Sequence, residues 1–70
     1  MFVVNERKFV MPKRAKEFAR RAYLKSKTRQ VIWWENCHGR APAGAADENG
    51  TVIWDCIDEV PEWAQPYFQI

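Results

Sequence analysis

The chain has 70 residues, of which 47% are hydrophobic and 14% aromatic, and it carries a formal net charge of +2. This composition is typical of a folded protein rather than a disordered one. A chain of this length forms one domain at most, and such a domain buries only about 60% of the surface of its unfolded chain. We therefore expect a single domain, residues 1–70, with too little core to support an enzyme's cleft as well.

The charge is divided by position along the chain. Residues 1–40 hold all eleven Lys and Arg side chains and three of the nine acidic ones, a balance of +8, whereas residues 41–70 are acidic with a balance of −6. Such an asymmetry has two interpretations, an anion-binding face or an internal match in which the acidic half partly neutralises the basic half. The sequence leaves both open.

Two short apolar segments, Phe2–Val4 and Phe9–Val10, begin the chain on either side of a polar turn. They predict either a small hairpin or one strand with a break. A helix is predicted next, from Pro12 to about Lys27, because proline suits the first turn and apolar residues recur at helical spacing. The expected core face of this helix consists of Met11, Ala15, Phe18, Ala19, Ala22 and Tyr23.

Two later runs, residues 30–37 and 51–57, are rich in β-branched and aromatic residues and are predicted as strands. The segment between them, Gly39 to Gly50, contains all three glycines and ends in an Asn-Gly pair. Such residues are typical of turns and loops. We therefore expect a long loop there, with the two strands forming an antiparallel hairpin around it.

The C-terminal segment, residues 58–70, is acidic and is called the acidic tail below. It is predicted to contain a short helical turn that begins near Pro61 and that Pro66 limits in length. Its aromatic residues are expected to close one end of the core; they are Trp63, Tyr67 and Phe68. The fold class is thus α+β, with one basic amphipathic helix packed on a small antiparallel sheet. The expected order is β(β)αββ followed by the C-terminal helical turn.

Residues that could carry chemistry are few. In the expected hairpin, Cys37 and Cys56 lie roughly 16 Å apart at about 3.3 Å per residue, too far for a disulfide. Cys37 and His38 form an isolated pair without the spacing of a zinc site. There is no nucleophile pattern and no glycine-rich phosphate loop. We expect no enzyme activity, no metal and no cofactor.

The first residues form an apolar run too short for a signal peptide, and no segment approaches the length of a membrane span. These features favour a cytoplasmic protein with reduced thiols and no membrane partner.

The outer face of the predicted helix is strongly basic. Four cations lie on one flank and three on the other, with only Glu17 opposing them, and Arg29 extends the patch past the helix end. Leu24 falls in the middle of this face, as in a protein interface with an apolar centre and a charged rim. The expected partner-binding residues are Lys13, Lys16, Arg20, Arg21, Leu24, Lys27 and Arg29. The alternatives are a solubilising face and a Leu24 that folds under the tail.

Strand alternation places Trp33 and Trp34 on opposite faces of the sheet. If the helix covers one face, the tail covers the other tryptophan or leaves it exposed. An exposed tryptophan beside Lys and Arg side chains is suited to stacking on nucleic-acid bases, whereas packing under the tail is the structural alternative.

The whole layout, one basic helix on a sheet with no site of its own, resembles the small inhibitors that phages and mobile elements direct against host machinery. The resemblance implies a non-enzymatic protein that docks on a larger partner with an acidic surface, such as a nucleic-acid-handling complex, and occludes it. The alternative is a protein that binds nucleic acid directly through the same Lys and Arg face together with an exposed tryptophan.

Overall fold

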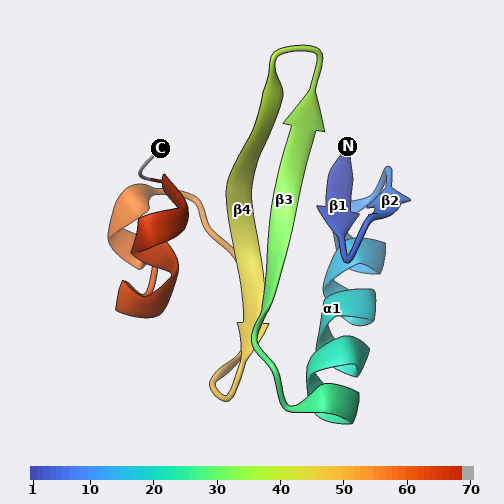
Figure 1. Ribbon diagram of the computed structural model, residues 1–70, viewed down its shortest axis with the longest axis vertical. Helices are drawn as coiled ribbons and strands as arrows, with labels where there is room; N and C mark the ends of the chain where they lie inside the picture. The colour runs from blue at the N-terminus through green and yellow to red at the C-terminus, as the bar shows by residue number, and fades with distance from the viewer. Residues whose placement is uncertain (69–70) are drawn as a thin grey trace.

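The computed structural model describes residues 1–68 and confirms the α+β class (Figure 1). One helix, α1, packs on a five-stranded antiparallel sheet, and two short 3₁₀ helices, η1 and η2, follow the last strand. The elements are β1 (Phe2–Val4), β2 (Arg7–Phe9), α1 (Pro12–Ser26), β3 (Gln30–Asn36), β4 (Gly39–Asp47), β5 (Gly50–Ile53), η1 (Ile57–Glu59) and η2 (Glu62–Phe68). Residues 69 and 70, the end of the predicted tail, lie outside this range.

The N-terminal segments form a hairpin, not a single broken strand. β1 pairs antiparallel with β2, and the two residues between them, Asn5 and Glu6, have positive φ angles of 49° and 67°. A two-residue turn with both φ angles positive matches the right-handed twist of its strands, although glycine is the usual second residue. Glu6 occupies that position here, and its side chain has a partner that is described below.

The order of strands in the sheet is β2-β1-β3-β4-β5. The predicted loop from Gly39 to Gly50 was wrong, because most of this segment is β4, which pairs with β3 on one side and β5 on the other. The predicted direct hairpin of residues 30–37 with 51–57 was wrong for the same reason. Gly39 and Gly50, both with φ of 126°, end two tight turns at opposite ends of β4.

Small residues in β4 allow close packing. The register shifts between Ile32 and Trp33, which pair with Gly44 and Pro42, so Ala43 is an extra residue at a bulge. A bulge tolerates a proline that a regular central strand would not. At Gly44, a Cβ atom would lie 2.9 Å from Cδ1 and 3.0 Å from Cα of Ile53, and closer still to the Val52 carbonyl oxygen. β5 therefore approaches β4 at a separation that only glycine permits.

The helix begins at Pro12 as predicted and ends at Ser26, one residue before the predicted end. Lys27 caps it in the left-handed conformation, and its N–H donates to the Tyr23 carbonyl oxygen at 2.6 Å. Ala15 and Ala19 are fully buried against the sheet, in one cluster with Val4, Ile32 and Ala46. The other predicted core residues of the helix, Phe18, Ala22 and Tyr23, are partly buried.

Met11 was wrongly assigned to the core face. It precedes the helix in an extended conformation and is 56% exposed. The helical periodicity used to place it does not apply to a residue outside the helix.

The tail covers the face of the sheet that α1 leaves open. Figure 1 shows η1 and η2 beside β4, with the strands between them and α1. The ring of Tyr67 packs edge-on against Trp33, with centroids 5.7 Å apart, and Phe68 lies 6.1 Å from Trp54. Val60 and Ala64 are buried. The tail aromatics thus lie across the second face of the sheet, not at one end of the core as predicted.

No helix within residues 1–68 has the length and apolar character needed to cross a membrane. Cys37 and Cys56 are both free and exposed.

Candidate docking surface

The cations of α1 divide into two flanks. Lys13, Lys16 and Arg20 lie on the flank toward β5, where they line shallow hollows together with residues of that strand. Arg14 and Lys25 lie on the opposite flank, which faces β2 because Phe18 packs on Phe9 there with ring centroids 5.4 Å apart. Arg21, which was predicted on this second flank, instead lines a hollow together with Lys16 and Arg20.

Most of these cations have no acidic partner. The only ion pair on α1 among residues 1–68 joins Arg21 to Glu17 at 4.0 Å, and both side chains are largely exposed. Arg20 donates to the Asp47 carbonyl oxygen at 3.3 Å, and its guanidinium lies 5.9 Å from the centre of the Tyr23 ring. The ammonium of Lys27 lies 6.0 Å from the same ring. These contacts orient the cations without neutralising them.

Arg29, which was predicted to extend the patch past the helix end, is paired with an acidic residue. Its guanidinium makes two bonds to the Glu48 carboxylate, at 2.7 and 3.2 Å, and lies 5.1 Å from the centre of the Trp63 ring. The hydrogen bond raises the pKa of Arg29 and lowers the pKa of Glu48. Arg29 thus connects the start of β3 to the β4–β5 turn and the tail, a set of partners that sequence reasoning missed.

The acidic tail lies away from the basic helix. Asp55, Asp58, Glu59 and Glu62 belong to the segment on the opposite face of the sheet, and no ion pair in residues 1–68 joins any of them to α1. The Glu59 carboxylate instead accepts from the N–H of Cys56 at 3.3 Å and caps η1. The acidic tail therefore does not neutralise α1, and the one ion pair that joins the two halves of the chain within residues 1–68 is Arg29–Glu48.

Leu24 is 49% exposed on the outer side of α1. It does not fold under the tail, because the tail lies on the other face of the sheet. An exposed leucine among cations is the arrangement expected of the centre of a docking surface.

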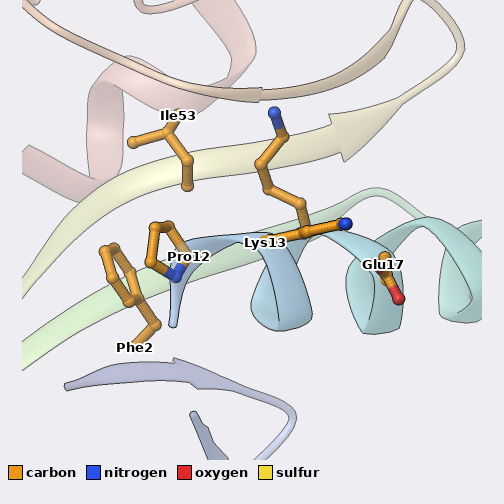
Figure 2. A pocket seen from close by; sticks show the side chains of 6 residues that line it. Phe2, Pro12, Lys13, Glu17 and Ile53 are labelled. Atoms are coloured by element: carbon orange, nitrogen blue, oxygen red, sulfur yellow. The ribbon is translucent and has the colours of Figure 1, made fainter. Parts of the chain in front are cut away.

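A groove runs between α1 and β5. One hollow of about 650 Å³ is lined by Phe2, Pro12, Lys13, Lys16, Glu17 and Ile53 (Figure 2). A second, of about 520 Å³, shares Lys16 and Glu17 with the first and continues along the helix to Arg21 and Thr51. Figure 2 shows Ile53 of β5 approaching the first turn of α1, with Phe2 near Pro12. The floor of the groove is apolar and its rim is basic.

The two tryptophans lie on opposite faces of the sheet, as predicted. Trp33 is partly buried beneath Tyr67, whereas Trp34 is 41% exposed and packs edge-on against Phe2 at 4.9 Å. Only Trp34 therefore offers a ring on the same side of the sheet as the cations.

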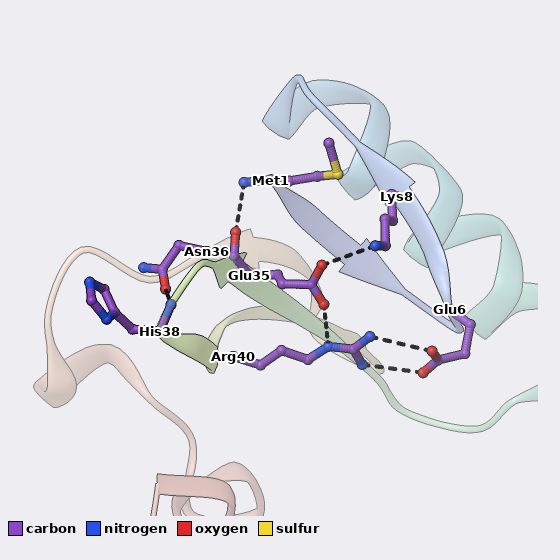
Figure 3. A network of polar contacts seen from close by, with 7 residues as sticks. All are labelled: Met1, Glu6, Lys8, Glu35, Asn36, His38 and Arg40. Atoms are coloured by element: carbon purple, nitrogen blue, oxygen red, sulfur yellow. Dashed lines mark hydrogen bonds and ion pairs between the residues drawn. The ribbon is translucent and has the colours of Figure 1, made fainter.

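Sequence reasoning missed a charged network beyond the helix (Figure 3). Arg40 bonds both oxygens of Glu6 at 3.2 and 3.3 Å and one oxygen of Glu35 at 2.8 Å, while Lys8 lies 3.1 Å from the other oxygen of Glu35. The hydrogen bonds from Arg40 hold the pKa of both glutamates below the usual range and raise the pKa of Arg40. The network links the β1–β2 turn to the β3–β4 hairpin.

The residues that could bind a metal ion, Cys37, His38 and Cys56, are not close enough together to form a metal site. His38 is exposed, and its backbone N–H donates to Oδ1 of Asn36 at 2.8 Å. Residues 1–68 contain no cluster of His, Cys, Asp and Glu side chains with the geometry of a metal site.

Comparison with known proteins identifies no relative, since no family model, curated protein or solved structure matches the chain. The function is therefore inferred from the surface itself.

Proposed function

We propose that the protein is a small non-enzymatic binding module that docks through the basic face of α1 on an acidic surface of a larger partner and occludes it, as a phage or mobile-element inhibitor would. The observation that carries this proposal is the uncompensated charge of the helix. Lys13, Arg14, Lys16 and Lys25 form no ion pair within residues 1–68, although nine acidic residues are present in the chain.

The placement of Leu24 favours a protein partner over a polyanion. Affinity at protein interfaces is concentrated in a few residues at the desolvated centre, surrounded by a rim that excludes water. Leu24 is half exposed among the cations of α1, and it can contribute affinity when a partner buries it. A leucine side chain forms no favourable contact with phosphate groups, so a surface that binds only phosphates would gain nothing from Leu24.

The alternative, direct binding of nucleic acid, is supported by Trp34. Its exposed ring lies on the helix side of the sheet, where a base could stack while cations contact phosphates. Binding of this kind weakens steeply as salt increases, because each phosphate contact releases condensed counterions. A mobility-shift titration with duplex and single-stranded oligonucleotides at low and moderate salt tests it, and the absence of any shift at low salt excludes it.

The first proposal is tested by affinity capture from the source cell, followed by titration of the captured partner. We expect Leu24→Ala to weaken the complex about tenfold or more, as a substitution at an interface centre does. The matched control is Ile57→Ala, because Ile57 is equally apolar and 58% exposed but lies with the acidic tail. Equal binding by wild type and Leu24→Ala would overturn the proposal.

Charge reversal provides the second comparison. Arg21→Glu with Lys25→Glu should abolish capture and also relieve inhibition of the partner's own activity, whereas Asp58→Lys with Glu62→Lys should not. Arg20 is left unchanged because its bond to the Asp47 carbonyl supports the fold.

A further inference from the structure

β5 is an edge strand whose outer side has no neighbour among residues 1–68. The N–H of Trp54 donates to the Ala43 carbonyl oxygen at 2.9 Å, so this residue directs its backbone toward β4. Backbone groups along an antiparallel strand alternate in direction. The backbone N–H and C=O groups of Val52 therefore also point toward β4. Those of Thr51 and Ile53 point outward, where they are free to pair with another strand.

The same edge borders the groove described above. Thr51 and Ile53 direct their side chains to the α1 side, because they pair in register with Ala46 and Gly44, and Ala46 belongs to the core beneath the helix. A strand added beside β5 would thus run along α1, past the rim cations Lys13 and Lys16.

We propose that this groove binds an extended acidic peptide segment of the partner, which adds a strand to the free edge of β5 and places an apolar side chain in the hollow between Phe2, Pro12 and Ile53. The inference rests on the proposed function and identifies the kind of segment recognised. In such strand addition, backbone hydrogen bonds provide affinity and side-chain pockets provide specificity. The acidic character follows from the rim, where the cations outnumber the single acid, Glu17.

The edge at the other end of the sheet is less suitable. β2 has three residues, and its exposed side chains include Arg7, whose guanidinium lies 5.4 Å from the centre of the Phe18 ring. Within residues 1–68, the free edge of β2 borders no hollow that is also lined by cations.

A second copy of the chain is a poorer occupant than a partner segment. The acidic stretch of this protein that carries an exposed apolar residue is Ile57–Glu59, and it is folded as a 3₁₀ helix capped by its own glutamate. A helical turn presents no strand edge to β5, and pairing of β5 with β5 of a second copy would bring two rims of cations together.

The probe for the test is a blocked synthetic peptide with the sequence Thr-Glu-Thr-Leu-Thr-Glu-Thr, whose Glu and Leu side chains share one face of an extended strand. It is titrated at low salt into ¹⁵N-labelled protein while amide shifts are recorded. We expect saturable shifts at Thr51 and Ile53 and along the β5 flank of α1. Two analogues, each methylated on one of the two alternate sets of backbone nitrogens, test the pairing. The one whose methyl groups face β5 should bind at least about tenfold more weakly than the other, because it cannot form the strand hydrogen bonds.

Two pairs of protein variants separate the edge from the charge. Thr51→Pro removes an outward N–H at an edge where proline is tolerated, whereas Thr51→Val retains it, so only the proline variant should lose binding. Lys13→Gln with Lys16→Gln should weaken binding about tenfold. Arg14→Gln with Lys25→Gln removes the same charge from the other flank and should have a much smaller effect.

Absence of binding at low salt, equal binding of the methylated analogues, or shifts that avoid β5 would each overturn the inference. The methylated analogues decide the matter even if Thr51→Pro fails to fold. Self-association of the protein without peptide, abolished by Thr51→Pro, would identify a second copy as the occupant and would also overturn it. If the peptide fails while Leu24→Ala still weakens partner capture, the proposed function stands without this groove; if both fail, neither stands.

Discussion

The close approach of β5 to β4 predicts that Gly44→Ala destabilises the protein. The new Cβ atom would lie 2.9 and 3.0 Å from atoms of Ile53 and nearer to the carbonyl oxygen of Val52. Cδ1 of Ile53 can move by a rotamer change, but the carbonyl and Cα are backbone atoms that move only if β5 moves. Because β5 is an edge strand, the expected response is a shift or partial loss of its pairing with β4.

The magnitude follows from two opposing effects. Overpacking of this kind costs about 1–3 kcal/mol. The lower entropy of the unfolded chain that comes with replacing glycine offsets about 0.4–1 kcal/mol. A net loss of about 1–2 kcal/mol is a large fraction of the roughly 4–10 kcal/mol expected for a domain of this length. At about 4–8 °C per kcal/mol, the thermal midpoint should fall by about 5–15 °C.

Urea and thermal unfolding, followed by far-ultraviolet circular dichroism, measure this change directly. A second variant, Gly44→Ala with Ile53→Val, removes the Cδ1 contact and leaves the backbone contacts in place, so it should recover little stability. An unchanged or raised midpoint for Gly44→Ala would refute the reasoning. Full recovery in the double variant would show that the side chain, and not the backbone of β5, sets the limit.

Three further predictions concern contacts that lie elsewhere. Arg40 holds the pKa of both its glutamate partners below the ordinary value of a glutamate, so their contribution to stability is complete above that ordinary value and is lost as the pH falls through the lowered pKa. The urea midpoints of wild type and Arg40→Gln should therefore differ at pH 7 and converge in acid. Thr51→Val should raise the free energy of unfolding by about 1 kcal/mol, since the buried hydroxyl has no hydrogen-bond partner in residues 1–68, and a lower urea midpoint would contradict this. Trp63→Phe removes the bond from Nε1 to the Asp47 carboxylate, 3.1 Å long, and should lower the unfolding free energy by about 1–3 kcal/mol in the same assay.

The parts of the fold that the sequence predicted well are those with a local signal. Proline in the first turn and apolar residues at helical spacing placed α1 within one residue of its observed end, because both effects act within the helix itself. Alternation placed Trp33 and Trp34 on opposite faces for the same reason. Met11 was misplaced because the helical pattern was extended one residue beyond the helix.

β4 was missed because its residues carry no strand signal of their own. Alanine, glycine and proline have low strand propensity, and a segment between Gly39 and Gly50 resembles a loop in composition. Its extended state depends on pairing with strands on both sides, and its small side chains are what allow Ala15 and Ala19 to approach the sheet. Two glycines about one strand length apart were the available sign of two tight turns.

The candidate site shows the same division. The cations and Leu24 were found from the sequence because helix geometry alone groups them. The groove was not, because it brings together Phe2, the start of α1 and Ile53, which are distant in sequence and meet only through the strand order. Arg29 was assigned to the patch by proximity in sequence, whereas its contacts lie with Glu48 and Trp63.

The unpaired cations of α1 lead to a last prediction. It distinguishes a helix whose charge is free for a partner from a helix whose charge the acidic tail neutralises. Lys16 has cations three residues before and four residues after it, Lys13 and Arg20, and each like-charge pair of this kind destabilises a helix by about 0.2–0.5 kcal/mol. Lys16→Gln should therefore raise the free energy of unfolding by up to about 1 kcal/mol at low salt, and the gain should disappear at about 1 M salt, where charges are screened within about 3 Å.

If the acidic tail neutralised the helix, the same substitution would instead lower stability at low salt. Denaturant midpoints of the two proteins at both salt concentrations give the sign. We expect Lys16→Gln to stabilise the fold and to weaken peptide binding. This combination is typical of a binding surface, where residues needed for a partner lower the stability of the free protein.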